Sequence, residues 1–535
     1  MDDTIGAALT IATLFKEKKE NYVIVSNNLY SAEKTYDFLL NFLPEEEVVF
    51  FPADELLRAE SLTSSRELLA QRLYGLGRLL DKKSKKVLIC HPSSLLRFLP
   101  DPARFGEECI HFSVGKEFNL PQLKEKLVEM GYQGINKVEH SLQFASRGDI
   151  LDIYSVSYLD PIRIEFFGDE IDSIRTFDIA TQQSKEKLKD ALVLPATDIF
   201  LNDDELSSFM ERANQQLQKD KGLLSRELGD LLDSNVGIDL ERFVSRDYRP
   251  SLYKYFGYAL GKKFNVLDYF TPKLIYVANK QSFVSNCDLL IREARDYFND
   301  LRIKTRLLSH LEEYMDVEDA LKGKGKTVYG QNFVKSPNDF TLLVKPIVMT
   351  GRSLVHVVPT IQTYLATEEK VVLSLKERQQ IDTVSSLLDE AKIPYEMVEG
   401  FDLPKGKLGI TKAFLNEGFD LQQMGIAYLS QAEVFGSRAI SSRFTSRFKD
   451  ATILRSYEDL HPGDYIVHEY NGIGQYLGVK TIEQDGIHRD YLHIAYAANE
   501  SLYVPLEQFR LVRKYAGREG AAPKLSHLNS AEWEK

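Results

Sequence analysis

Short apolar runs alternate with segments of helical periodicity in the first part of the chain. The apolar runs lie at 22–26, 48–51 and 87–90, and segments with apolar residues at helical spacing lie at 8–19 and 66–80. Strands that alternate with helices in this way are typical of a parallel sheet in an α/β layer fold. We therefore predict such a fold for the beginning of the chain.

The pattern changes around Ile110. From 112 to about 196 the chain shows two-residue alternation and glycine turns, which predict a small antiparallel insert. Beyond it a strand is predicted at 274–277, and long helical segments are predicted at 204–217, 223–232 and 283–315. The α/β pattern therefore resumes after the insert, as expected of one domain that is split by another.

A further α/β unit is predicted between 329 and 431, with strands at 370–375, 408–411 and 426–429. The stretch 437–449 follows it and holds four basic residues and no acidic one: Arg438, Arg443, Arg447 and Lys449. Charge runs of this kind usually lie in solvent, so we favour a linker over a nucleic-acid contact.

The segment from 460 to 515 is predicted to be all-β. It contains short β-branched and aromatic runs and the turn dipeptides Asn471-Gly472 and Asp485-Gly486. Its size is that of a small closed barrel. Tyrosines are dense here, and packing in the core or at the rim is the default expectation for them: Tyr465, Tyr470, Tyr476, Tyr491, Tyr496 and Tyr503.

The length of the chain limits the number of its domains, and its charge limits how it could bind DNA. Its 535 residues are enough for about three to five domains. Lys and Arg number 67 against 79 Asp and Glu, which gives a net charge of −12. Tight, non-specific DNA binding over the whole surface is therefore not expected, and any nucleic-acid contact would be a local patch or lie in another part of the protein.

The cysteines and the hydropathy indicate a cytoplasmic protein with no membrane partner. Cys90, Cys109 and Cys287 are odd in number and far apart, which excludes a disulfide scaffold and a zinc cluster and fits a reducing compartment. No run of 18 or more apolar residues occurs, and the acidic amino-terminal segment lacks a secretory cleavage site.

The chain lacks the motifs of a stand-alone enzyme. The nearest match to a phosphate-binding loop, Gly325-Lys326-Thr327, has Ala320 at the first glycine position and is interpreted as a loop. Asp54-Glu55 follows an apolar run but is interpreted as an acidic loop rather than a magnesium-binding pair. No metalloprotease motif, Cys/His metal spacing or nucleophile elbow is present, so we predict no catalytic, nucleotide or metal site and no cofactor.

Two stretches have the character of binding surfaces. In the predicted strand 162–167, alternation places Arg163, Glu165 and Phe167 on one face. An isolated exposed aromatic is ordinary, but arginine with an aromatic residue is typical of interface hot spots, and both interpretations stay open. In the all-β segment, an edge strand before the Asp485-Gly486 turn is predicted to accept a partner strand, unless its charges only protect the edge.

Both stretches resemble the transcription-repair coupling factor family (Mfd). The segment 146–178, SRGDILDIYSVSYLDPIRIEFFGDEIDSIRTFD, is similar to the inserted domain that this family shares with UvrB, and 51–80 is similar to their first domain. The segment 461–517 resembles the family's RNA-polymerase-interacting domain, a Tudor-like barrel related to CarD. UvrB has no such barrel, so the combination indicates the N-terminal half of a coupling factor.

The resemblance implies partners and site residues. The family's insert recruits UvrA, and its contacting residues fall on Arg147, Arg163 and Phe167. The barrel binds the β subunit of RNA polymerase through a strand whose apolar residue matches Ile482, with Thr481 and Glu483 beside it. The family's first module copies the UvrB architecture without its ATPase, in agreement with the missing motifs.

Members of this family continue into an ATP-dependent translocase that moves on double-stranded DNA. That motor, with its ATP and magnesium, is absent here, so we expect this chain to be a non-catalytic part of a longer protein. The rival interpretation is an independent helicase-like or UvrB-like nucleic-acid-binding protein with its own ATP site.

The resemblance also implies an α/β multidomain architecture in six parts. They are a UvrB-like domain split into 1–110 and 197–328, an inserted α+β UvrA-binding domain at 111–196, a small α/β domain at 329–452, a CarD-like barrel at 455–522, and the start of a linker helix at 523–535.

Overall fold

The computed structural model describes most of the chain. The described residues are 4–54, 57, 66–330, 342–349, 354–413, 415, 417–435, 460–468, 472–484, 487–497, 500–505, 512–515 and 525–526. Within these ranges the backbone alone is described at residues 4, 66–67, 481–484, 487–490, 505 and 513. The predicted basic stretch 437–449 and the turn Asp485-Gly486 lie outside the described residues.

A five-stranded parallel sheet forms the centre of the molecule. Its strands lie in the order β13-β12-β1-β3-β2 and are β1 (Tyr22–Val25), β2 (Val48–Phe50), β3 (Val87–Cys90), β12 (Leu274–Val277) and β13 (Lys326–Tyr329). Tyr22 is level with both Val87 and Leu274. Strands from both sides of the insert therefore pair in one sheet, which confirms that the α/β pattern resumes after it.

Helices pack on both faces of this sheet, whose strands β1, β2 and β3 are buried on both sides. The helices of the central domain are α1 (Thr4–Lys18), α2 (Leu29–Leu39), α4 (Arg66–Leu80), α5 (Pro92–Leu95), α6 (Pro102–Glu107), α10 (Tyr253–Ala259), α11 (Lys280–Ile303) and α12 (Val317–Leu321). The helix predicted at 283–315 is wrong in its second half. It ends at Ile303 because Thr305 takes a left-handed φ of 52° and the chain turns back.

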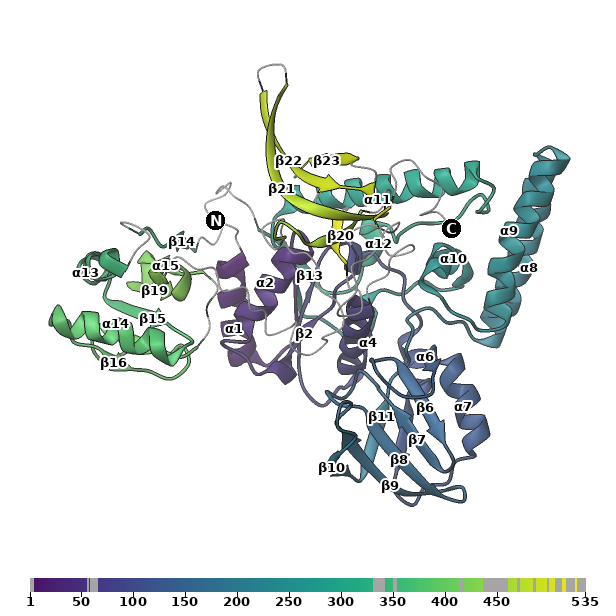
Figure 1. Cartoon of the computed structure of the whole chain (residues 1–535), viewed down its shortest axis with the longest axis horizontal. Helices are drawn as coiled ribbons and strands as arrows, with labels where there is room; N and C mark the ends of the chain where they lie inside the picture. The colour runs from purple at the N-terminus through teal and green to yellow at the C-terminus, as the bar shows by residue number, and fades with distance from the viewer. Residues whose placement is uncertain are drawn as a thin grey trace.

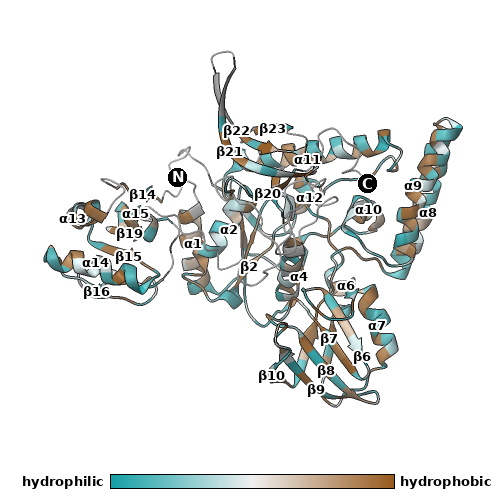
Figure 2. Cartoon of the chain, viewed as in Figure 1, coloured by the Kyte–Doolittle hydropathy of each residue, from teal (hydrophilic) through white to brown (hydrophobic). Residues whose placement is uncertain are grey.

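The insert is a six-stranded sheet with one helix, joined to the centre by two paired strands. Its strand order is β10-β9-β8-β7-β6-β5, and Figure 2 shows hydrophobic and hydrophilic residues alternating along these strands. The elements are β4 (Ile110–Ser113), α7 (Leu120–Glu129), β5 (Gln133–Gly134), β6 (Gln143–Arg147), β7 (Ile150–Ile153), β8 (Ile162–Phe167), β9 (Glu170–Phe177), β10 (Ser184–Leu188) and β11 (Asp190–Val193). Strand β4 enters and β11 leaves side by side and antiparallel.

After the insert the chain forms a helical hairpin, α8 (Asp203–Gly222) and α9 (Arg226–Val244). Both helices are longer than predicted. Phe209 and Phe243 pack edge to face between them, with ring centroids 4.8 Å apart. Figure 1 shows this hairpin and the small α/β domain at opposite ends of the molecule.

The small α/β domain is built on a mixed sheet in the order β14-β18-β19-β15-β17-β16. Its elements are β14 (Lys345–Pro346), α13 (Val357–Thr367), β15 (Lys370–Ser374), α14 (Arg378–Glu390), β16 (Glu396–Met397), β17 (Leu408–Thr411), β18 (Phe419–Leu421), β19 (Ile426–Ser430) and α15 (Gln431–Phe435). It packs on α2 through Phe38 against Phe419, and on the turn after α2 through Phe42 against Phe401. An ion pair of 2.6 Å between Lys34 and Glu417 adds to this contact.

The last sheet is antiparallel, in the order β23-β22-β21-β20-β24. Its strands are β20 (Tyr465–His468), β21 (Gly472–Gln484), β22 (Ile487–Ala495), β23 (Ser501–Pro505) and β24 (Val512–Lys514). The all-β prediction is confirmed. The described pairings leave β23 and β24 at the two edges, so closure into a barrel stays a prediction.

Short 3-10 helices complete the described elements, at Glu45–Glu47, Pro250–Leu252, Val266–Asp268, Leu354–His356 and Gln422–Met424. Among the described residues, no helix combines the length and the apolar composition needed to cross a membrane.

A buried carboxylate fastens the insert to the central domain. Asp198, just beyond β11, accepts hydrogen bonds from Nε of Arg72 and Nε of Arg97, each 2.9 Å long, and all three side chains are almost fully buried. The Arg97 guanidinium also lies 4.0 Å from the ring centroid of Tyr253. Burial alone would raise the pKa of Asp198, but the charges and hydrogen bonds of the two arginines outweigh it and hold the pKa well below its ordinary value.

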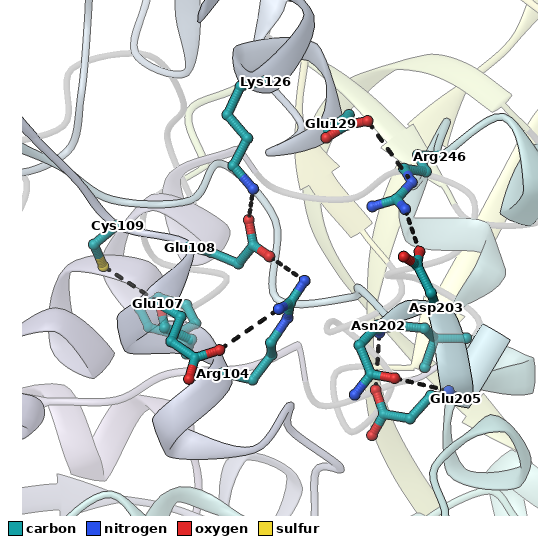
Figure 3. A network of polar contacts seen from close by, with 12 residues as sticks. Arg104, Glu107, Glu108, Cys109, Lys126, Glu129, Asn202, Asp203, Glu205 and Arg246 are labelled. Atoms are coloured by element: carbon teal, nitrogen blue, oxygen red, sulfur yellow. Dashed lines mark hydrogen bonds and ion pairs between the residues drawn. The ribbon is translucent and has the colours of Figure 1, made fainter.

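Further polar contacts support the same junction (Figure 3). Glu108, just before β4, pairs with Arg104 and with Lys126 of α7. Arg246 bridges Glu129 of the insert, at 3.8 Å, and Asp203 at the start of α8, at 2.6 Å. Polar contacts therefore hold the insert just before its first strand β4, just after its last strand β11 and at its helix α7.

We predict that Asp198→Asn destabilises the junction by about 3–5 kcal/mol, because two buried guanidinium groups lose a charged partner. The volume of the side chain is unchanged, so packing is not the cause. The measurement is urea unfolding with hydrogen exchange followed in residues 110–199. Asp160→Asn removes an exposed partner of Lys185 and serves as control, with an expected cost of about 1 kcal/mol or less. Equal effects of the two substitutions would contradict a special role of Asp198.

Candidate partner-binding surfaces

Strand β8 presents the outward face that its sequence predicts. Ile162, Ile164 and Phe166 are buried, whereas Arg163 and Glu165 are half-buried on the other side. Phe167 is the last residue on this outward face. Its side chain is 84% exposed, although it is large and apolar. An aromatic residue held in solvent at the end of a rigid strand has the form of an interface anchor.

Arg163 is fixed within the sheet. Its Nε and Nη2 atoms donate to the two carboxylate oxygens of Asp152 on β7, both at 2.7 Å, and Nη2 also donates to Oε1 of Gln182 at 3.0 Å. Its guanidinium lies 4.3 Å from the ring centroid of Phe177. The hydrogen bond with Asp152 raises the pKa of Arg163 above its ordinary value. Arg163 therefore presents only its outer edge to a partner.

A second ion pair adjoins the first. Glu165 accepts from Arg175 on β9 and from Ser173 Oγ, and the hydrogen bond from Arg175 lowers the pKa of Glu165. Arg163 and Arg175 lie directly opposite each other across β8 and β9. Like charges at such positions repel, so the flanking carboxylates of Asp152 and Glu165 stabilise the arrangement.

Arg147 lies on the same face, two strands away. The register aligns it with Ile150 and, through that residue, with Glu165 of β8. It is exposed, and its Nη2 donates 3.0 Å to the carbonyl oxygen of Asn136. The structure therefore brings Arg147, Arg163 and Phe167 together on one surface, as two cationic groups and one apolar projection.

Sequence reasoning did not find Asp152 and Gln182, which hold Arg163 in place. The carboxylate at 152 is eleven residues from Arg163 along the chain. Only the register of β7 against β8 places the two side by side. Alternation along a single strand predicts a face but not the neighbour across the sheet.

The second surface lies on the long hairpin β21–β22, which projects from the body of the molecule (Figure 1). Strand β20 pairs with β21 only at Gly472–Gln475. Tyr476 still exchanges backbone hydrogen bonds with Gly463 and Asp464, at 2.7 and 2.8 Å. Beyond Tyr476, the described pairings of β21 are all with β22, so no described strand lies along its other edge there. Thr481, Ile482 and Glu483 lie on this stretch, opposite Asp490, Arg489 and His488, and their side chains lie outside the description.

The near match to a phosphate-binding loop belongs to the central sheet. Lys326 begins β13 and is level with Leu274, so the interpretation of this motif as a loop is wrong. Gly325 takes φ of +153°, and a Cβ there would lie 2.7 Å from the carbonyl oxygen of Pro272. This glycine serves the close approach of two chain segments, not the binding of a phosphate.

Asp54 is buried and lines a cavity of about 210 Å³ beside the junction. Arg72, Gln143, Thr197, Asp198 and Tyr248 also line it. Glu55 lies outside the described residues. In the part of the chain that the structure covers, no group of three or more His, Cys, Asp and Glu side chains is placed to hold a metal ion.

The comparisons with known proteins match the two domains on which these surfaces lie. Residues 110–199 match the UvrB interaction domain family, and residues 460–516 match the CarD-like/TRCF RID domain family. The transcription-repair-coupling factor of Bacillus subtilis (strain 168) is 29% identical over 542 aligned residues, which cover 99% of this chain and 46% of that protein.

The chain is similar over almost its whole length to the N-terminal half of a transcription-repair-coupling factor. The coupling factors of Staphylococcus haemolyticus (strain JCSC1435) and Staphylococcus aureus (strain MRSA252) are each 27% identical, over 99% and 98% of the chain. The chain spans about half the length of these coupling factors, at 46% of each. The resemblance seen in the sequence is thereby confirmed.

Proposed function

We propose that this chain is the partner-binding half of a transcription-repair coupling factor, which binds stalled RNA polymerase and recruits UvrA for nucleotide excision repair. The observation that carries the proposal is the presence of two matched interaction domains, at 110–199 and 460–516, on one scaffold. Each of them offers an open surface in the described structure, and the two surfaces lie on different sheets.

UvrA is the partner proposed for the insert. Phe167 projects 84% exposed on the face that carries the outer edge of Arg163, and Arg147 adds a cationic group on the same face. These residue types are enriched in hot spots, where an aromatic anchor enters a pocket and arginines meet carboxylates. A UvrA surface with an apolar pocket flanked by acidic groups would complement this face.

The β subunit of RNA polymerase is the partner proposed for the C-terminal sheet. Beyond Tyr476, the edge of β21 that pairs with no described strand offers backbone groups to an incoming strand, with Thr481, Ile482 and Glu483 along it. In such β-augmentation, main-chain hydrogen bonds supply affinity and alternate side chains supply specificity. Closure of this sheet into a Tudor-like barrel, and the domain boundaries predicted from the sequence, are part of the proposal.

The proposal assigns no catalysis to this chain. In the full-length protein an ATP-dependent translocase would act on double-stranded DNA and displace the stalled polymerase, with ATP and magnesium bound there. The rival proposal, a helicase-like protein with its own ATP site, differs in one observable property. ATP hydrolysis by this chain alone, with or without DNA, would support the rival.

We predict that Phe167→Ala weakens UvrA binding about thirtyfold, because truncation of a hot-spot anchor costs about 2 kcal/mol or more. The fold should be unaffected, since the side chain lies in solvent. The measurement is isothermal titration with purified UvrA. Leu159→Ala is the matched control, because Leu159 is also an exposed apolar residue of the insert, at 63%. Unchanged affinity of the Phe167 variant, or equal loss in both variants, would contradict the proposed surface.

We predict that Ile482→Arg removes polymerase binding and leaves UvrA binding intact. The new charge would have to lose its hydration in the contact, at a cost of a few kcal/mol. An edge strand tolerates a charged residue, so the sheet should still fold. One titration of the variant against each partner, with circular dichroism, is the measurement. Loss of both interactions together would place Ile482 in the core and overturn the proposed edge.

A further inference from the structure

The side of the C-terminal sheet that faces away from its core carries half-buried aromatic residues. Its inner side packs a core of Ile466, Tyr476, Leu492, Ile494, Tyr496, Val504 and Val512. The outer side carries Tyr465, Tyr491, His493 and Tyr503, none of which belongs to that core. The exposed side of an antiparallel sheet normally alternates to polar residues, so rings at these positions call for a physical reason.

Two of these rings stack on each other across neighbouring strands. His493 on β22 and Tyr503 on β23 lie directly opposite each other. Their rings stack with centroids 4.7 Å apart and planes inclined by 14°, and His493 Nε2 lies 3.1 Å from Ser501 Oγ. Tyr491 lies two residues from His493 along β22, on the same side of the sheet.

Open space and a cation lie next to these rings. On β21 the residue opposite His493 is Gly478, and no atom lies within 4 Å of the position that a Cβ would take there. Lys480, opposite Tyr491, is exposed, and its Nζ lies 5.3 Å from the ring centroid of Tyr503. The described side chains place no carboxylate within ion-pair distance of Lys480.

We propose that this aromatic face binds single-stranded nucleic acid. Bases stack on Tyr491 and on the outer faces of the His493–Tyr503 stack, and Lys480 pairs with a backbone phosphate. Base–aromatic stacking on a sheet face with a nearby cation is a common mode of recognition of unpaired strands. Duplex bases already stack on one another, so their faces are not available to aromatic side chains. Among the described side chains the site combines a cation with planar rings and holds no carboxylate at ion-pair distance, which fits a phosphate-bearing strand better than a basic peptide.

The rings of this site lie apart from both surfaces of the proposed function, whereas Lys480 adjoins the stretch of β21 that carries Thr481, Ile482 and Glu483. The insert face lies on a different sheet, and the polymerase contact is assigned to the backbone edge of β21 rather than to the face of the sheet. A local patch of this kind is compatible with the net charge of −12, which opposes binding by the surface as a whole. The inference therefore does not depend on either partner assignment.

The test is fluorescence anisotropy with the 535-residue chain and three labelled probes: a 12-nucleotide oligo-dT, a 12-nucleotide oligo-rU and a 12-base-pair DNA duplex. Both single strands should bind at least fivefold more tightly than the duplex. Tyr503→Thr and His493→Thr should each weaken single-strand binding about fivefold or more. Lys480→Gln should reduce the slope of log affinity against log salt by about 0.7, as expected for one lost phosphate contact.

Two variants serve as controls. Phe167→Ala removes an exposed aromatic residue from the insert and should leave binding of the strands unchanged. Tyr503→Phe keeps the ring and should retain most of the affinity. Threonine suits an exposed strand position, and thermal unfolding checks that the Thr variants keep the fold.

Three results would overturn the proposal. One is absence of single-strand binding by the unaltered chain. Another is equal affinity for the duplex and the single strands. The third is a loss of polymerase binding in the Tyr503 and His493 variants without a change in nucleic-acid binding, which would assign the aromatic face to a protein partner.

Discussion

The carboxylate of Asp198 between Arg72 and Arg97 is the contact on which the arrangement of this molecule depends. The insert leaves and rejoins the central domain at two neighbouring points, and by themselves two paired strands would let it rotate. Asp198 lies at the exit point and bonds to a helix and a loop of the central domain, in a buried setting where a displaced charge would be costly. Helix α4 also approaches the insert closely, since a Cβ at Gly77 would lie 2.6 Å from Leu194. The binding face of the insert is therefore held in a fixed orientation.

A buried contact also holds the small α/β domain at the other end of the central domain. Its sheet is apolar on both sides, and the face covered by α1 and α2 shares one core with residues of the small α/β domain. The aromatic contacts of Phe38 and Phe42 make this a packed interface rather than a tether. The central domain therefore acts as a rigid scaffold, and the residues assigned to partners lie on strands at its periphery. Rigid placement of this kind lowers the entropic cost of binding.

Much of the fold could be predicted from the sequence, because buried parallel strands and amphipathic helices leave strong periodic signals. The strands at 87–90, 274–277 and 408–411 have the predicted bounds. The end of α11 could not be predicted, because the left-handed turn at Thr305 depends on tertiary packing and not on a glycine or proline signal. The candidate site was likewise predictable only in part. The face of β8 follows from alternation, whereas the fixation of Arg163 by Asp152 depends on the register between strands. The aromatic face of the C-terminal sheet could not be predicted either, because alternation along one strand does not show which of its two sides lies in solvent.

The central claim is that two partners bind one rigid scaffold through separate surfaces. The most direct test is the affinity of the chain for UvrA, measured without RNA polymerase and at a saturating concentration of it, together with sedimentation velocity of the three-component mixture. The account predicts the same UvrA dissociation constant within about twofold and a single species that contains all three components, because the two surfaces share no residue. Competition between UvrA and polymerase for the chain would contradict it.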